Sequence, residues 1–320
     1  MQRISIGAAV LLIAQVVLAV ALNVQREEVL DFSQQKSFLD FDPEQVTSME
    51  ISDAETTLLL KKEGEKWVMP DSYAALADGR NVTAKLRELA SVKHGLAVAT
   101  TADGARRFHV DAENSERHIV LYQGEKVVAD FYLGTSAGFR QTHAARAGEQ
   151  MVVVLGVNSF DFTPEAKEWL DRTLLHVKEE TVQRVERTGY SLEKIQKKDQ
   201  KKWQVTVAGT TKPANADEAQ KLLDKVAGVT VDDIVEPARA SELLQQEPVL
   251  DFSLVVRDSE ARLKYLFVVN DEETMAVKRS DMDHVYLVPK YLVEEIQAVT
   301  PEVLMEEDRE NGEDAGKAQQ

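Results

Sequence analysis

The sequence predicts an α+β fold of two tandem, structurally similar units of mostly antiparallel hairpins with packed helices, preceded by one transmembrane helix. Three observations lead to this prediction. An uncharged apolar run stands near the N-terminus, short apolar stretches alternate around turns, and one turn is written twice. Residues 61–67 read KKEGEKW and residues 197–203 read KKDQKKW, so Trp67 and Trp203 lie 136 residues apart.

The composition limits the classes of function. The 320 residues are 43% hydrophobic and 29% charged, enough apolar content for a folded core. The formal net charge is −17, and a surface this acidic repels phosphate backbones, which excludes general nucleic-acid binding. There is no cysteine, so disulfides, thiolate catalysis and cysteine-ligated zinc are excluded as well.

Residues 4–24 carry no charged side chain and are long enough to cross a bilayer. As a helix they span roughly 31 Å, close to the ~30 Å hydrocarbon thickness. Because Arg3 precedes the run, the positive-inside rule places the N-terminus in the cytoplasm. The alternative is a cleaved secretory signal, since residues 19–21 (AVA) have the form of a cleavage site. We expect a single-pass protein of the bacterial inner membrane, with the bulk of the chain in the periplasm.

The chain divides into five predicted segments. They are a transmembrane anchor at 4–24, a connector at 25–45, a first α+β repeat unit at 46–177, a second at 178–300, and an acidic, disordered tail at 301–320. The first strand of each unit begins at Val46 and at Val182, which are separated by the same 136 residues as the two tryptophans. Two landmarks at one offset indicate an internal duplication.

Each unit continues from its first hairpin into a helix. Ala77-Asp78 and Ala216-Asp217 both precede apolar residues spaced along one helix face. A carboxylate at such a position accepts backbone N–H groups and favours the helix dipole, so we predict that Asp78 and Asp217 cap helices. Trp67 and Trp203 lie on the return strand of the hairpin, where each indole can cover the helix that follows. A ligand platform is the alternative interpretation of the two indoles.

Two more hairpins and a closing helix complete each predicted unit. Thr163-Pro164-Glu165 and Thr300-Pro301-Glu302 both predict a helix start with proline at the first helical position. Trp169 lies on the predicted closing helix of the first unit and has no counterpart in the second.

This layout resembles an uncharacterised family of bacterial envelope proteins, domain-of-unknown-function family 4340. The resemblance is carried by FDPEQV at 41–46, the hairpin ending at Trp67, Ala77-Asp78, the strand end Leu133-Gly134, and the Trp-Leu-Asp-Arg-x-Leu-Leu segment at 169–175 with Trp169 and Arg172. It covers most of residues 38–300. Because such proteins are often encoded beside an ABC transporter of the type linked to gliding motility, the resemblance implies protein partners. It implies no chemistry.

Catalytic and metal-binding motifs are weak in this sequence. Gly134-x-x-x-Gly138 is followed by Phe139-Arg140, where a phosphate-binding loop needs Lys-Ser/Thr, so a hairpin connection is the better interpretation. Asp281, Asp283 and His284 could ligate a metal, but their place between two strands favours a solvated turn.

These observations lead to one main hypothesis of function and two others. The main hypothesis is a non-catalytic, membrane-anchored periplasmic accessory or scaffold protein of an envelope complex, associated with an ABC-type transporter. The alternative is a periplasmic module that binds a glycan, peptide or small ligand in the cleft between the units. A third is a hydrolase that uses Asp281 and Asp283. We predict no cofactor, and we expect structural or interaction roles for Trp67, Trp203, Asp78, Asp217, Gly134, Trp169 and Arg172.

Overall fold

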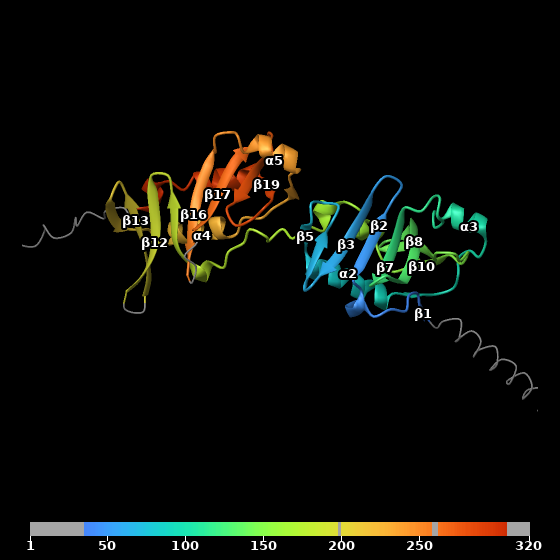
Figure 1. The fold of residues 1–320 in the computed structure, drawn as a ribbon. Helices are drawn as coiled ribbons and strands as arrows, with labels where there is room; N and C mark the ends of the chain where they lie inside the picture. Colours follow the sequence, from blue (N-terminus) through green and yellow to red (C-terminus); the bar gives the residue numbers. More distant parts are fainter. Residues whose placement is uncertain (1–34, 198–199, 258–261, 306–320) are drawn as a thin grey trace, which may run out of the picture. The chain divides into compact units, whose positions relative to one another are not determined.

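The computed structural model describes residues 35–197, 200–257 and 262–305. Its contacts divide the chain into two compact units, with the boundary between Trp169 and Leu170 (Figure 1). We expected the boundary between the repeat units at 177/178, eight residues after the boundary that the contacts give. No helix within the described ranges is long and apolar enough to cross a membrane, and the predicted anchor at 4–24 lies outside them.

The first unit is built on a ten-stranded sheet of order β1-β6-β10-β9-β8-β7-β2-β3-β4-β5. Its strands are β1 (Lys36–Ser37), β2 (Ser48–Ser52), β3 (Thr57–Glu63), β4 (Lys66–Met69), β5 (Ala75–Ala77), β6 (Lys93–His94), β7 (Arg117–Gln123), β8 (Lys126–Gly138), β9 (Gln141–Arg146) and β10 (Val153–Leu155). Its helices are α2 (Gly79–Ser91) and α3 (Ala102–Arg107), with the 3-10 turns η1 (Pro43–Gln45), η2 (Ser159–Phe162) and η3 (Ala166–Glu168).

The second unit is built on a nine-stranded sheet of order β14-β13-β12-β11-β16-β17-β18-β19-β15. Its strands are β11 (Val182–Arg187), β12 (Tyr190–Lys197), β13 (Gln200–Val207), β14 (Thr210–Pro213), β15 (Asp233–Ile234), β16 (Leu250–Val256), β17 (Arg262–Val269), β18 (Thr274–Arg279) and β19 (Val285–Pro289). Its helical elements are η4 (Glu179–Thr181), α4 (Ala216–Ala227), α5 (Pro237–Leu243), α6 (Lys290–Gln297) and α7 (Pro301–Leu304).

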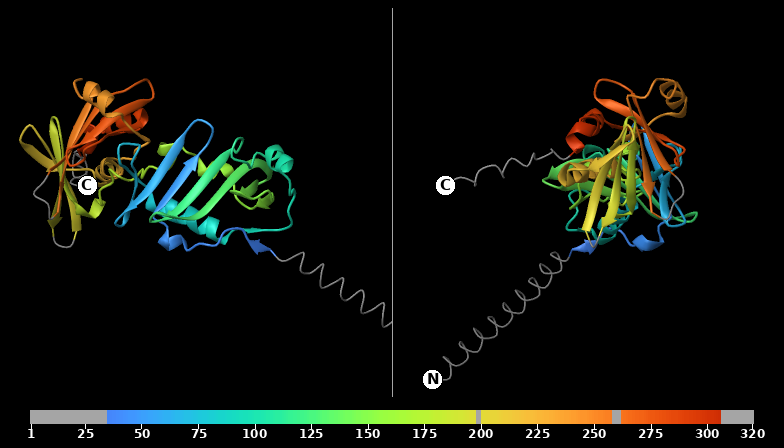
Figure 2. Two further views of the ribbon diagram at one scale, coloured as in Figure 1. Left: turned by 45° about the vertical axis from the view of Figure 1, so that its right-hand side comes forward. Right: turned by 90° about the vertical axis from the view of Figure 1, so that its left-hand side faces the viewer.

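The two sheets follow one order of connection. The series β5-β4-β3-β2-β7-β8-β9-β10-β6 has the same chain order as β14-β13-β12-β11-β16-β17-β18-β19-β15, and the first sheet adds only β1. A long helix, α2 or α4, follows the first strand of each series, β5 or β14, and a short helix, α3 or α5, precedes the central strand β7 or β16. Neighbouring strands are antiparallel, as Figure 2 also shows, which confirms the predicted α+β class with mostly antiparallel sheet.

Alternation of apolar and polar residues explains the hairpins. In β2, Met49 and Ile51 are buried while the residues between them are half-buried, as expected for a strand with one face on the core. The turn between β3 and β4 places Gly64 at φ 61°, a conformation that glycine adopts without steric cost. The corresponding turn of the second unit, residues 198–199, lies outside the described residues.

An arginine at the end of a strand holds the segment that leads into each sheet. In the first unit, Arg146 at the end of β9 donates from Nε to the Phe38 carbonyl at 2.7 Å, and its guanidinium lies 5.3 Å from the Phe38 ring centroid. In the second unit, Arg279 at the end of β18 donates to the Tyr265 hydroxyl, which itself donates to the Leu175 carbonyl at 2.9 Å. Residues 36–45, assigned above to a connector, are therefore an integral part of the first unit.

The predicted ends of the two units need correction. The predicted closing helix of the first unit is only the 3-10 turn η3 at residues 166–168. Glu165 provides no side-chain cap, and the carbonyl of Trp169, which follows the turn, accepts from the Asp78 amide instead of continuing a helix. Residues 301–305 are not disordered, since Leu304 of α7 is buried and Met305 forms a β-bridge with Ala214. Residues 306–320 lie outside the described residues.

Gly134 lies inside β8 rather than at a strand end. A Cβ at this position would overlap with the carbonyl groups of Phe108 and His109, which follow α3. The amide of Thr135 donates to the Phe108 carbonyl at 3.0 Å, so the loop is held against the strand by a backbone hydrogen bond. Glycine at 134 permits this close approach.

We predict that Gly134→Ala destabilises the first unit by about 1–3 kcal/mol or more, because the new methyl group must displace backbone atoms. Hydrogen exchange of the full-length protein, followed by mass spectrometry, would report the loss in peptides from β8 and from residues 105–110. Gly156→Ala is the matched control, since a Cβ there meets no atom within 4 Å. Equal effects of the two substitutions would contradict the close-approach argument.

Tyr265 should make the second unit sensitive to alkali. Burial raises the pKa of its phenol, and the hydrogen bond from Arg279 offsets this only in part. A group whose folded pKa is raised stabilises fully below the unfolded pKa of about 10, and this contribution is lost as the pH rises through the folded pKa. Above pH ~10 we expect the wild type to lose stability faster than Tyr265→Phe in denaturant titrations. Tyr291→Phe, at an exposed tyrosine, should leave the wild-type slope unchanged.

Candidate functional site

Three of the predicted residues meet at the N-terminus of α2. Asp78 caps the helix, accepting from the Arg80 amide at 2.9 Å and from the Asn81 amide at 3.3 Å. The Asp78 amide donates to the Trp169 carbonyl at 2.7 Å. Trp67 on β4 is buried, and a Cβ at Gly79 would lie 3.3 Å from its indole, so this ring covers the first turn of α2.

A cleft of about 590 Å³ lies beside this junction, within the first unit. This volume falls in the range of ligand-binding pockets, roughly 300–1,000 Å³. The lining residues come from α2, the start of β7, η2 and the segment after η2; they are Asn81, Lys85, Arg117, Phe160, Asp161, Thr163, Glu165, Glu168 and Trp169.

The indole of Trp169 is only 1% exposed and donates from Nε1 to the Thr163 carbonyl at 2.8 Å, which fixes the turn around η3. Phe160 is 75% exposed, although it lies in η2 between a buried serine and Asp161. One wall of the cleft is therefore the turn that Trp169 fixes, and the exposed ring of Phe160 stands beside it in contact with solvent.

The positive charge of Lys85 is balanced by two carboxylates in the cleft. Its ammonium lies 2.7 Å from the Asp161 carboxylate and 3.0 Å from that of Glu88. Burial alone would lower the pKa of Lys85, but the hydrogen bonds to Asp161 and Glu88 outweigh burial, so its pKa lies above the ordinary value. This lysine stays charged and joins α2 to η2.

Arg117 keeps donor capacity that the described residues do not use. Its Nη1 donates to the Glu116 carbonyl and lies 3.5 Å from the Asp53 carboxylate, a long contact. Its Nε is buried and has no hydrogen-bond partner among the described residues. An unpaired buried donor costs free energy, and a guanidinium binds carbonyl and carboxylate oxygens strongly. Because the Nε itself is buried, a ligand oxygen could reach it only after a rearrangement of the Arg117 side chain.

The remaining predicted residues belong to the second unit. Trp203 on β13 is buried, and the Lys194 ammonium lies 5.3 Å from its ring centroid. Arg172 forms an ion pair with Asp232 at 3.1 Å, and its carbonyl accepts from the Val231 amide. These contacts hold the 170–175 segment on the second unit. The interaction roles proposed for the predicted residues stay predictions.

Asp217 is not the N-cap of α4, contrary to the prediction. Asn215 is the cap, and its Oδ1 accepts from the amides of Asp217 and Glu218 at 3.0 and 3.2 Å. The physical reason is the preceding residue. The Ala214 amide donates to the Trp203 carbonyl, which keeps Ala214 in the sheet and makes Asn215 the first residue free to cap. Asp217 lies in the first turn, where its charge still favours the dipole.

In the acidic turn before β19, which contains Asp281, Asp283 and His284, Asp281 forms an ion pair with Arg279. Both carboxylate oxygens of Asp281 accept from the buried Arg279 guanidinium, at 2.6 and 3.1 Å. Asp283 contributes its backbone carbonyl to Lys278. Over the described residues, no group of three or more His, Asp or Glu side chains could hold a metal ion.

Sequence reasoning missed the residues that form the cleft, above all Arg117 and Phe160. Arg117 stands at the start of an apolar strand, a common place for a solvated charge, and the other residues that line the cleft come from distant parts of the chain. The phenylalanine offered a weak signal, because an apolar residue between Ser159 and Asp161 interrupts a polar turn. Nothing local distinguishes it from Phe162, which is fully buried.

Comparison with known proteins gives one match. A family model described as "Domain of unknown function (DUF4340)" matches residues 67–248, more than half of the chain. The matched range includes both hairpin tryptophans and the 169–175 segment, and it is shorter than the 38–300 over which we noted the resemblance. No curated protein and no solved structure matches the chain.

The corrected cap gives a direct test with two neighbouring residues. We predict that Asn215→Ala destabilises α4 by about 1 kcal/mol, since two amides lose their acceptor. Asp217→Ala should cost at most ~0.3–1 kcal/mol, because it removes only a charge near the dipole. Hydrogen exchange of α4 peptides would measure both, and a larger loss for Asp217→Ala would contradict the assignment.

Proposed function

The chain belongs to the DUF4340 family, and from this premise we propose that it is a non-catalytic, single-pass protein of the bacterial inner membrane. In this proposal its two units lie in the periplasm and act as an accessory or scaffold subunit of an envelope complex, associated with an ABC-type transporter. The apolar, uncharged run at 4–24 supplies the anchor.

The observation that carries the proposal is how the chain after the anchor joins the first sheet. Lys36 and Ser37 pair with β6, Phe38 is buried, and Arg146 holds the Phe38 carbonyl. The sheet therefore begins about ten residues after the apolar run, with no further domain between them. A short connection of this kind suits a scaffold that is tethered to the membrane.

The shared strand order of the two sheets supports a second part of the proposal, that the units are copies of one duplicated module. Nine strands in the same order, with helices at the same two places, are difficult to reach independently. Trp67 and Trp203 occupy the same strand of the series, β4 and β13. Two similar modules in tandem would offer a complex two related surfaces.

The scaffold proposal is tested by crosslinking in living cells. Full-length protein with a C-terminal affinity tag, crosslinked in cells and purified in detergent, should carry other membrane proteins that mass spectrometry identifies. A matched chain with residues 1–24 replaced by a cleavable secretory signal is the control and should lose these partners. Recovery of the anchored protein alone would reject the scaffold.

A second candidate function, a periplasmic binding module, is favoured by the cleft in the first unit. The guanidinium of Arg117 and the exposed ring of Phe160 line it, and they suit a ligand that combines carbonyl or carboxylate groups with an apolar or sugar face, such as a peptide-bearing glycan. This site lies within one unit rather than between two.

A thermal-shift assay of the full-length protein with cell-wall muropeptides tests this candidate. Ligand at a hundredfold excess over its dissociation constant should stabilise the first unit by about 2.7 kcal/mol. Phe160→Ser should abolish the shift, whereas Phe139→Ser, at another exposed phenylalanine, should preserve it. The candidate is rejected if muropeptides and simple sugars leave the melting temperature unchanged.

A further inference from the structure

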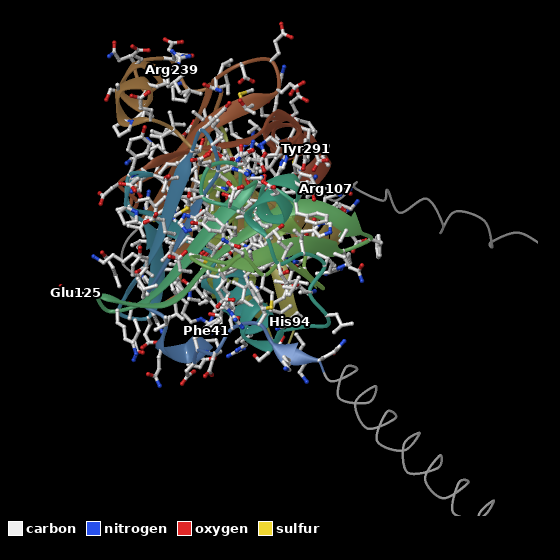
Figure 3. All side chains as sticks on the ribbon, turned by 90° about the vertical axis from the view of Figure 1, so that its right-hand side faces the viewer. Phe41, His94, Arg107, Glu125, Arg239 and Tyr291 are labelled. Carbon is white, nitrogen blue, oxygen red and sulfur yellow. The ribbon has the colours of Figure 1, made fainter. Side chains whose placement is uncertain are left out.

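The described chain begins at one edge of the first sheet. Lys36 pairs with His94, His94 with Leu155, and Leu155 with Thr142, so β1, β6, β10 and β9 lie side by side in one row. Figure 3 labels His94 beside β1, where the described chain starts, and Glu125 on the far side of the first unit. The proposed anchor must therefore approach the unit at the β1 edge.

The strand and loop segments that build this edge, 35–39, 91–102, 131–148 and 150–160, contain no Asp or Glu. Acidic residues adjoin them, among them the exposed Asp40 and Glu149, which forms an ion pair with Arg146. Elsewhere the chain is strongly acidic, with 55 Asp and Glu residues among 320. Glu88, which lines a cavity at this edge, is paired with Lys85. The net charge of the edge is therefore opposite to that of the whole protein.

Exposed basic side chains occupy the same segments. Lys36, Lys93 and Arg140 are exposed and form no ion pair with another described residue. Gln35 and Gln141 line one cavity of about 400 Å³, which brings the start of the chain close to the turn between β8 and β9. The three cations thus surround the point where the chain leaves toward the proposed anchor.

Large apolar side chains project from the same edge. Leu96 and Val98, in the loop after β6, are 62% and 48% exposed. Phe139, at the tip of the β8–β9 turn, is 93% exposed. Gly138 and Arg140 on either side of it have φ values of 145° and 51°, so a tight turn holds the ring outward. Apolar residues beside cations are typical of a surface that meets the headgroup region of a bilayer.

The length of the intervening chain limits how far this edge can lie from the membrane. Ten residues, 25–34, separate the apolar run from the first described residue. Whatever their conformation, ten residues reach at most ~36 Å. If residues 4–24 span the bilayer, the start of β1 therefore lies within about 36 Å of its surface.

We propose that the β1 edge surface, formed by Lys36, Lys93, Leu96, Val98, Phe139 and Arg140, docks on the anionic headgroups of the bilayer that holds the anchor. This inference rests on the membrane anchorage proposed above and goes beyond it, because it gives the first unit a defined face toward the lipid. A basic residue near an anionic surface contributes about a fivefold preference for the docked state, so three together contribute about a hundredfold.

The absence of native cysteine permits a clean test. Full-length protein is reconstituted into vesicles of phosphatidylethanolamine and phosphatidylglycerol, with a single environment-sensitive label on Ala97→Cys, an exposed alanine between Leu96 and Val98. Glu125→Cys, at the far side of the unit, is the matched control. The label at 97 should be several-fold less accessible to a water-soluble quencher than the label at 125.

Charge reversal identifies the cause of the protection. The variant Lys36→Glu/Lys93→Glu/Arg140→Glu should reduce the docked-to-undocked ratio by more than about a hundredfold, because it removes three attractive charges and adds three repulsive ones. Vesicles of phosphatidylcholine alone, which carry no net charge, should also weaken the docking of the wild type. Unchanged hydrogen exchange in β8 and β9 would show that the variant is folded.

Each outcome decides between the two proposals. Equal accessibility at 97 and 125 in protein that floats with the vesicles would overturn the docking inference and leave the anchor intact. Protection of position 97 in cells, but not in lipid vesicles, would assign the surface to a protein partner and also overturn it. Failure of the protein to float with the vesicles would reject the anchor and the inference together.

Discussion

The structure of each unit depends on the hydrogen bonds that hold its leading segment in the sheet. In the first unit this is the bond from Arg146 to the Phe38 carbonyl, reinforced by the contact between guanidinium and ring. In the second unit Arg279 and Tyr265 hold the Leu175 carbonyl. The bonds of the second unit are buried and that of the first is partly buried, so the bonded groups would be costly to separate, above all in the second unit. These bonds fix the segment that precedes each sheet to the sheet itself.

The sequence was informative where a local pattern decides the structure. Hairpin periodicity, the paired tryptophans and the Asp78 cap depend on neighbouring residues, and the structure confirms these local features. It was misleading where distant contacts decide. Asn215 became the cap because Ala214 is bonded to Trp203, and Gly134 is needed because a loop 25 residues earlier packs on it. The sequence showed no sign of the cleft beside α2 for the same reason, since its lining comes from three separate stretches of the chain.

The distribution of charge on the first unit supports the proposed membrane orientation, in addition to the fold. In a strongly acidic protein, the segments at one sheet edge carry more basic than acidic residues, and the described chain begins at that edge. A scaffold that rests on the bilayer through this edge would hold its remaining surface, and the cleft within the first unit, at a constant height above the membrane.

The anchorage itself is the central claim, and one measurement tests it most directly. Spheroplasts that express Glu125→Cys full-length protein are treated with a membrane-impermeant maleimide, and their membranes are then washed with carbonate. The account predicts that the cysteine is labelled before lysis and that the labelled full-length chain stays in the membrane pellet. Labelling only after lysis, or release of the full-length chain by carbonate, would contradict it.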